Sequence, residues 1–196
     1  STISINHLAR KIERPDNLIG LHFFAPVERM KLVEVVKGTK TSEKTLARSL
    51  DLLATMRKTP IVVNDCPGFY TSRVVATYTA EALTMLSEGI PPDLIDISAT
   101  KSGMPIGPLA MADMTSLVLL KDIFKSIIGD GHQVWVKGTN VLGTLNKLTN
   151  EFKRTGKKGG EGIYSYPKGN PEPWADIKKC FTPKTEPLDP KDIEQR

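Results

Sequence analysis

The chain has 196 residues, 39% of them hydrophobic and 25% charged, which is enough for one or two compact domains with a real core. Its net charge of +5 is compatible with a phosphorylated ligand, but scattered lysines and interleaved acidic residues argue against a nucleic-acid-binding surface. No apolar run approaches the ~20 residues that span a bilayer and no secretory signal is visible, so we expect a cytoplasmic protein. The two cysteines, Cys66 and Cys180, make neither a disulfide framework nor a metal cluster, and no metal is expected.

The first 66 residues have the pattern of an α/β fold. Residues 18–24 and 31–36 predict strands, because both are rich in β-branched and aromatic residues. Ser42 can cap a helix through about residue 57, and TPIVVND then predicts a short buried strand of the kind found in parallel sheets. About three strands and no Gly-x-Gly-x-x-Gly turn are found, so we expect an incomplete doubly wound domain that begins at a truncation.

The pattern becomes helical after Pro67-Gly68, which break the chain. Helices are expected over residues 69–88, ending at Gly89, and then over 92–101, within 107–131 and over 140–152. GIYSY is compatible with a last extended segment, and the prolines after Tyr166 predict an irregular linker or an arm lying on a surface. The expected organisation is α/β in residues 1–66, all-α in 67–166, and a proline-rich linker or arm in 167–196.

Two titratable residues lie inside apolar, strand-like segments. His22 precedes two phenylalanines, and Glu34 is the only polar side chain among residues 32–36. A buried carboxylate is costly unless it is paired and hydrogen-bonded, so we expect His22 and Glu34 to face each other. Glu34 would then fix the tautomer of the ring, and the other ring nitrogen could take a proton from a substrate hydroxyl. The alternative is a core histidine satisfied by its neighbours and a glutamate on an edge strand that points to solvent.

Five segments in one order resemble the 3-hydroxyacyl-CoA dehydrogenase family: STISI, GLHFFAPVERMKLVEVVKG, TPIVVNDCPGFYTSR, EALTMLSEG and GKKGGEGIYSY. The resemblance covers residues 1–166 and is strongest to the dehydrogenase portion of the multifunctional fatty-acid oxidation complex α-subunits. It implies the C-terminal part of a Rossmann-type NAD-binding domain, without its glycine-rich half, followed by a helical dehydrogenase C-terminal domain. The implied activity is the β-oxidation step that converts an L-3-hydroxyacyl-CoA to the 3-ketoacyl-CoA, with NAD as the hydride acceptor.

The resemblance also implies roles for individual residues. His22 corresponds to the general base of the family and Glu34 to its orienting carboxylate. Ser1 corresponds to a serine that contacts both substrate and cofactor. Lys158 corresponds to a lysine that contacts the cofactor, with Lys157 as the alternative match, although a solvated turn would also explain this basic loop.

Two positions depart from the pattern of the family. Ala25 stands where the family often has an asparagine that helps to hold the histidine, the cofactor and the substrate. Ser72 stands where another asparagine approaches the substrate. Ser72 can still donate a hydrogen bond to substrate but Ala25 cannot, and the loss of one such donor could cost ~10²–10³ in turnover.

Three functional hypotheses stay open at this point: a fragment of a β-oxidation dehydrogenase, a non-catalytic assembly module, and a related 3-hydroxybutyryl-CoA dehydrogenase. The implied partners are an acyl-CoA substrate, a second copy bound through the helical domain, and a thiolase β-subunit in the parent complex. Because the glycine-rich half that cradles a pyrophosphate is missing, we expect the chain alone to be inactive and to bind NAD poorly or not at all.

Overall fold

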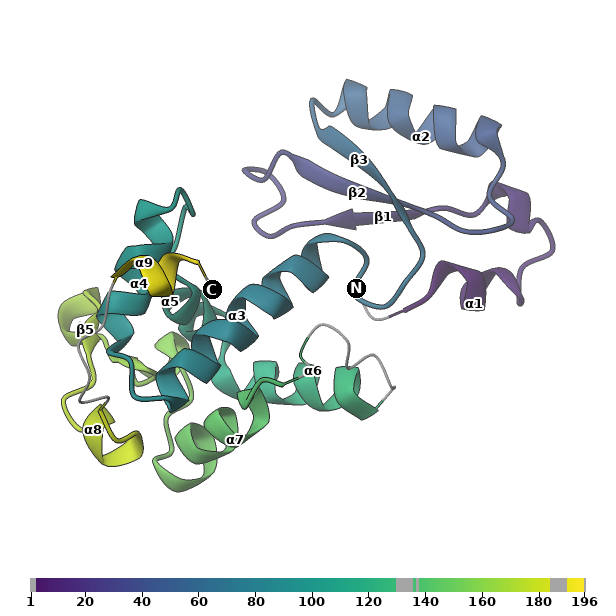
Figure 1. Cartoon of the computed structure of the whole chain (residues 1–196). Coiled ribbons are helices and arrows are strands. Elements are labelled where there is room, and N and C mark those ends of the chain that lie inside the picture. The colour runs from purple at the N-terminus through teal and green to yellow at the C-terminus, as the bar shows by residue number, and fades with distance from the viewer. Residues whose placement is uncertain (1–2, 130–135, 137, 184–189, 196) are drawn as a thin grey trace. The chain divides into compact units, whose positions relative to one another are not determined.

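The computed structural model describes residues 3–129, 136, 138–183 and 190–195 (Figure 1). The chain divides into two compact units, unit 1 (Ser1–Val74) and unit 2 (Val75–Arg196). Unit 1 combines helices with a mixed sheet, and unit 2 is mainly helical, which confirms the predicted fold class. The predicted domain boundary after residue 66 falls shortly before this division and stays a prediction.

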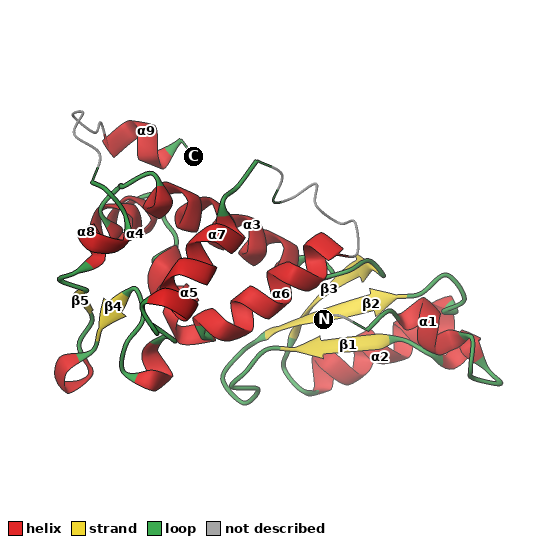
Figure 2. Ribbon diagram, turned by 90° about the horizontal axis from the view of Figure 1, so that it is seen from below, coloured by secondary structure: helices red, strands yellow, loops and turns green. Residues whose placement is uncertain are grey.

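Unit 1 is built on a three-stranded sheet with β2 in the middle (Figure 2). β1 (Gly20–Phe23) runs antiparallel to β2 (Leu32–Lys37), and β2 runs parallel to β3 (Thr59–Asn64). The register places His22 opposite Glu34 on adjacent strands, so both side chains lie on the same face of the sheet. Two α-helices lie within this unit, α1 (Ile5–Ala9) and α2 (Glu43–Thr55), and a 3-10 turn (Pro15–Asn17) lies between α1 and β1.

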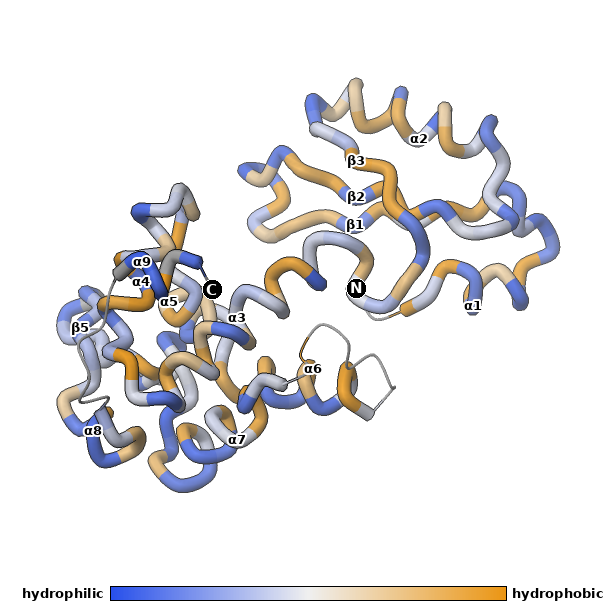
Figure 3. Tube along the Cα trace, in the orientation of Figure 1, coloured by the Kyte–Doolittle hydropathy of each residue, from blue (hydrophilic) through white to orange (hydrophobic). Residues whose placement is uncertain are grey.

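Helix α2 covers one face of the sheet. Val33 and Val35 of β2 are fully buried against Leu53 of α2, with half-buried Leu46 and Leu50 beside it. The tube of α2 alternates between hydrophobic and hydrophilic colours in Figure 3, as expected for a helix that turns one stripe to a core. The apolar stripe of α2 therefore packs on this face of the sheet.

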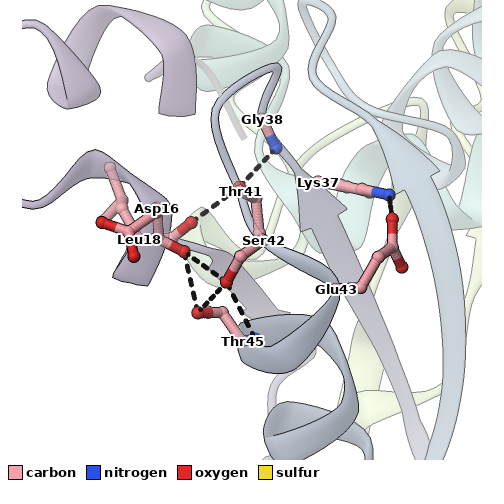
Figure 4. Close-up of polar contacts among 8 residues, drawn as sticks. All are labelled: Asp16, Leu18, Lys37, Gly38, Thr41, Ser42, Glu43 and Thr45. Atoms are coloured by element: carbon pink, nitrogen blue, oxygen red, sulfur yellow. Dashed lines mark hydrogen bonds and ion pairs between the residues drawn. The ribbon is translucent and has the colours of Figure 1, made fainter.

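The start of α2 shows why the helix begins where it does (Figure 4). The Ser42 hydroxyl accepts a hydrogen bond from the Thr45 amide at 3.2 Å, which satisfies one of the free amides of the first turn and confirms the predicted cap. The hydroxyls of Ser42 and Thr45 both donate to the Asp16 carbonyl, at 3.0 and 2.8 Å. Lys37 at the end of β2 forms an ion pair with Glu43 in the first turn. These contacts tie the helix start to the segment before β1.

The opposite face carries Glu34 and Val36. Here Ile5 of α1 and Phe69 pack with Val36, and all three are buried. A Cβ added to Gly20 would lie 2.7 Å from Ile5 Cδ1, so a larger residue at this position of β1 would require the Ile5 side chain to shift.

The prediction that β3 is buried is wrong. β3 lies at an edge of the sheet, and Val62 in its centre is 51% exposed. The apolar run of this strand has the composition of a strand covered on both faces, but among the described residues β3 has a strand neighbour on one side only. Composition therefore identified the strand and its parallel pairing but not its place in the sheet.

Unit 2 consists of short helices, whose bounds are α3 (Thr71–Ser87, with its first turn in unit 1), α4 (Pro92–Lys101), α5 (Pro108–Thr115), α6 (Leu117–Gly129) and α7 (Val141–Asn146), the last continuing as a π-helix (Lys147–Glu151). The end of α3 is formed as predicted, because Gly89 adopts a left-handed φ of 86° and its amide bonds to Leu86. No described helix has the length and apolar character needed to cross a membrane.

The segment predicted as a linker or arm contributes to unit 2. β5 (Glu172–Pro173) pairs antiparallel with β4 (Tyr164–Ser165), and two short helices follow, α8 (Ile177–Cys180) and α9 (Pro190–Glu194). Cys180, Phe181 and Ile193 are buried in the core of the unit. The described part of this segment therefore contributes to the core of unit 2, and its assignment as a linker or arm stays a prediction.

Candidate active site

The structure brings His22 and Glu34 into direct contact. His22 Nδ1 and Glu34 Oε2 lie 2.5 Å apart, as the facing register of β1 and β2 requires. Glu34 is 0% exposed on the central strand, whereas the His22 side chain is 25% exposed. The alternative of an edge-strand glutamate that points to solvent is therefore wrong.

The second oxygen of Glu34 is held by the start of α3. Glu34 Oε1 accepts hydrogen bonds from the backbone amides of Tyr70, at 2.9 Å, and Thr71, at 2.8 Å. Burial raises the pKa of the Glu34 carboxyl, but the Thr71 amide, the His22 ring and the Tyr70 amide together outweigh it, and the pKa is lowered. Free amides and a positive helix end favour the anion in the same way. Glu34 is thus an ionised carboxylate with both oxygens bonded.

The loop between β3 and α3 presents these amides. Asp65 at its start accepts hydrogen bonds from the amides of Ile5 and Asn6, at 3.0 and 2.7 Å, which ties the loop to α1. Gly68 and Phe69 both adopt positive φ, at 73° and 46°, so the chain turns sharply before the helix begins. The sequence reasoning missed the role of these amides. Two features of the sequence could have indicated it: a carboxylate in an apolar strand, which needs hydrogen-bond donors, and a strand–turn–helix junction further along the chain, which offers free amides.

The environment of the ring leaves one nitrogen for chemistry. Phe24 and Phe69 contact the His22 ring edge-on, with ring centroids 4.8 and 5.6 Å away. Because ionised Glu34 can only accept, the Nδ1 that faces it carries a proton, and in the neutral ring Nε2 holds the lone pair. Nε2 has no hydrogen-bond partner among the described residues. The arrangement can therefore take up a proton at Nε2 and stabilise the resulting imidazolium.

The remaining predicted site residues lie in different places. Ser72 follows Thr71 in the first turn of α3 and is half-buried, and Ala25 is exposed in the loop after β1. Lys158 is exposed in a short 3-10 turn of unit 2, with Lys157 beside it over the Tyr166 ring. Ser1 lies outside the described residues. Ser72 thus shares the helix start that holds Glu34, while the roles of all four residues stay predictions.

A second buried polar cluster lies in unit 2. Asp113 is 0% exposed and accepts hydrogen bonds from the amides of Ile163 and Tyr164 and from the Tyr166 hydroxyl, at 2.8, 2.9 and 2.8 Å. Burial raises the pKa of Asp113, and these bonds oppose the rise. Arg154, also buried, donates to the carbonyl of Tyr164 at 3.2 Å. Because its two charged side chains, Asp113 and Arg154, are buried and bonded to the β4 segment, this cluster holds that segment in place.

Comparison with known proteins decides the family. Residues 1–66 match the 3-hydroxyacyl-CoA dehydrogenase NAD-binding domain, and residues 68–166 match the 3-hydroxyacyl-CoA dehydrogenase C-terminal domain. The chain belongs to the 3-hydroxyacyl-CoA dehydrogenase family. This family membership confirms the resemblance inferred from the five sequence segments.

Curated relatives and solved structures of the family agree. Fatty acid oxidation complex subunit α from Psychrobacter arcticus is 39% identical over 90% of this chain, and that from Vibrio cholerae is 36% identical over 85%. The chain spans about a quarter of these relatives, 24% and 23%. The (S)-3-hydroxybutyryl-CoA dehydrogenase of Ralstonia eutropha superposes with a TM-score of 0.76 at 34% identity, covering 85% of this chain and 58% of that one. The 3-hydroxybutyryl-CoA dehydrogenase of Escherichia coli gives 0.77 at 30%, covering 89% and 36%.

The residues that the structure describes form no cradle for the pyrophosphate of NAD. A dinucleotide cradle needs a glycine-rich turn that opens a helix with free amides, and the sequence has no Gly-x-Gly-x-x-Gly. Each of the three described α-helices that begin in unit 1 already has a side-chain oxygen of this chain on its first amides: Asp65 at α1, Ser42 at α2 and Glu34 at α3. The chemistry that these residues support is proton transfer and positioning.

Proposed function

We propose that this chain carries the proton-transfer centre of an NAD-dependent 3-hydroxyacyl-CoA dehydrogenase of fatty-acid β-oxidation. The observation that supports this most strongly is the contact of His22 with a fully buried, amide-bonded Glu34. Such a pair fixes one ring nitrogen and frees the other, which is what a general base for a substrate hydroxyl needs. The family match and the relatives from fatty-acid oxidation complexes supply the substrate class.

In the proposed reaction His22 Nε2 accepts the proton of the 3-hydroxyl group as the C–O bond becomes a carbonyl. The Nδ1–H donates to Glu34 throughout, so the ring becomes an imidazolium beside a carboxylate and the positive charge is compensated where it forms. A bound NAD would supply the hydride acceptor, whereas the residues of this chain would supply the proton transfer at His22 and the positioning of the ring.

Other residues have supporting roles in this proposal. Ser72 lies one residue beyond the Thr71 amide that holds Glu34, so its hydroxyl is suited to bond the substrate near the reacting carbon. Ser1 would contact both cofactor and substrate, and Lys158 the cofactor, as in the family. The helical unit would form a homodimer contact, and a thiolase β-subunit would be the partner in a complex like those of the relatives.

Reduction of acetoacetyl-CoA by NADH tests the proposal. The natural protein that carries this sequence should be active, and its His22→Gln variant should lose roughly 10²–10⁴-fold in kcat, the usual contribution of a general base. His7→Gln, a histidine on exposed turns of α1, is the matched control and should stay within about twofold of the parent, since surface substitutions away from such features have small effects. Equal activity of His22→Gln and the parent would refute the role of His22.

A non-catalytic assembly module is the second candidate. Ala25, exposed after β1 without a hydrogen-bonding side chain, favours it. A natural protein that folds but shows no turnover with short- or long-chain substrates would support this alternative against the dehydrogenase.

A further inference from the structure

Lys58, which lies between α2 and β3, forms hydrogen bonds with the loop that follows His22. The loop joins β1 to β2, and it makes one internal turn in which the Pro26 carbonyl accepts the Met30 amide at 3.0 Å. The Lys58 ammonium reaches this loop and donates to the carbonyls of Val27, at 2.5 Å, and Met30, at 2.8 Å. One cation therefore joins both arms of the turn.

The position of Lys58 is itself fixed by the backbone. Arg57, the residue before it, adopts a left-handed φ of 56° after the end of α2, and the Lys58 amide bonds to the Leu53 carbonyl at 2.9 Å. The next residue, Thr59, begins β3 and bonds through its amide to the Lys31 carbonyl at 2.8 Å. The lysine thus extends from a junction of two regular elements, and its Cα cannot move without disturbing the end of α2.

Two features connect the hydrogen bonds of Lys58 with the orientation of the His22 ring. Phe24, the first residue of the loop, packs edge-on against the His22 ring. Ala25 next to it has no polar side chain that could tie the loop to the sheet. Hydrogen bonds from a charged donor are stronger than neutral ones in the same surroundings, so the two surface bonds from Lys58 together restrain the loop.

We propose that Lys58 is a positioning residue for His22: by clamping the loop it keeps Phe24 against the ring and narrows the orientations of the imidazole. The proposal rests on the proposed function of His22 as the base. The Lys58 side chain acts through the loop and has no contact with the reacting atoms in this account.

The test measures the exchange with water of the His22 Nδ1 proton by NMR on the chain itself. Lys58→Met should raise this exchange rate roughly tenfold, the effect of losing a hydrogen bond to a charged group. The backbone amide of Val35, in the fully buried centre of β2, is the internal reference and should exchange as in the parent. Lys40→Met removes an equal charge from an exposed turn of the same unit and should change neither rate.

A merely structural role of Lys58 would accelerate the Val35 amide and the His22 proton by the same factor, and that result would overturn the proposal. An unchanged His22 proton in Lys58→Met would overturn it as well. Lys58→Arg should restore most of the protection because it keeps a charged donor, and this variant decides the matter if Lys58→Met fails to fold. A parent chain without any protected Nδ1 proton would instead refute the His22–Glu34 pairing, and with it the proposed function.

Discussion

Replacing Glu34 with glutamine keeps the shape of the side chain and removes its charge. In the structure three hydrogen bonds converge on the carboxylate, two from the Tyr70 and Thr71 amides and one from His22. Bonds to a charged group contribute about 1.5–3 kcal/mol and neutral bonds about 0.5–1.5 kcal/mol, so each of the three loses about 1 kcal/mol. Relief from burying a charge opposes this loss. We expect Glu34→Gln to lower the free energy of unfolding by about 1–2 kcal/mol.

The same substitution should reverse the tautomer of His22. The glutamine oxygen has the two backbone amides to accept, so its NH₂ group faces Nδ1, which must then accept. The ring proton moves to Nε2, and the nitrogen proposed as the base no longer has a lone pair. In the serine-protease triad the analogous aspartate-to-asparagine change costs about 10⁴ in kcat, and a loss of similar order is expected here.

Two assays check this prediction. Urea unfolding of the chain measures the stability change, and acetoacetyl-CoA reduction by the natural protein measures the turnover. Glu13→Gln removes an exposed carboxylate before β1 and should be close to neutral in both. A Glu34→Gln protein with turnover within tenfold of the parent would refute the reasoning, because the tautomer would then be irrelevant to the chemistry.

Four further outcomes follow from the structure. Because the pKa of Glu34 is lowered in the fold, its ionisation stabilises the folded chain at every pH above the ordinary pKa of 4.5. This stabilisation is lost as the pH falls through the lowered pKa, so stability should fall more steeply with acid in the parent than in Glu34→Gln. Ser116 has φ of 83°, and Ser116→Gly should raise the stability of the chain by about 1 kcal/mol in thermal unfolding; a decrease would contradict the strain. A Cβ on Gly162 would lie 2.1 Å from Asp113 Oδ1, so Gly162→Ala should destabilise by about 1–3 kcal/mol in the same assay, and a neutral result would contradict the close packing. NAD titrated calorimetrically into the chain alone should give no saturable heat, and tight stoichiometric binding would contradict the absence of a pyrophosphate cradle.

Local patterns were enough to predict most of the elements. β-branched runs located the strands, Ser42 located the start of α2, and Gly89 located the end of α3. The contact of His22 with Glu34 was predicted because strand alternation and the cost of a buried carboxylate leave few other solutions. These inferences succeeded because each depends on residues close together in the sequence or on a single strong energetic rule.

The features that the sequence did not predict all depend on contacts between segments that are distant in the chain. The amides of Tyr70 and Thr71 bond to Glu34 from 36 and 37 positions further along the chain. Because almost every residue type carries the same backbone amide, the sequence does not indicate which amides form these bonds. The exposure of Val62 depends on which strands flank β3, which the strand itself does not encode. The Asp113 cluster joins segments about 50 residues apart in the same way.

The central claim is that Glu34 holds a proton on His22 Nδ1 and leaves Nε2 as the base. The most direct test is the ¹⁵N spectrum of the His22 ring, recorded on the chain with the ring neutral. The account predicts a protonated Nδ1 with a proton shifted far downfield, and an unprotonated Nε2. A neutral ring that carries its proton on Nε2 would contradict it.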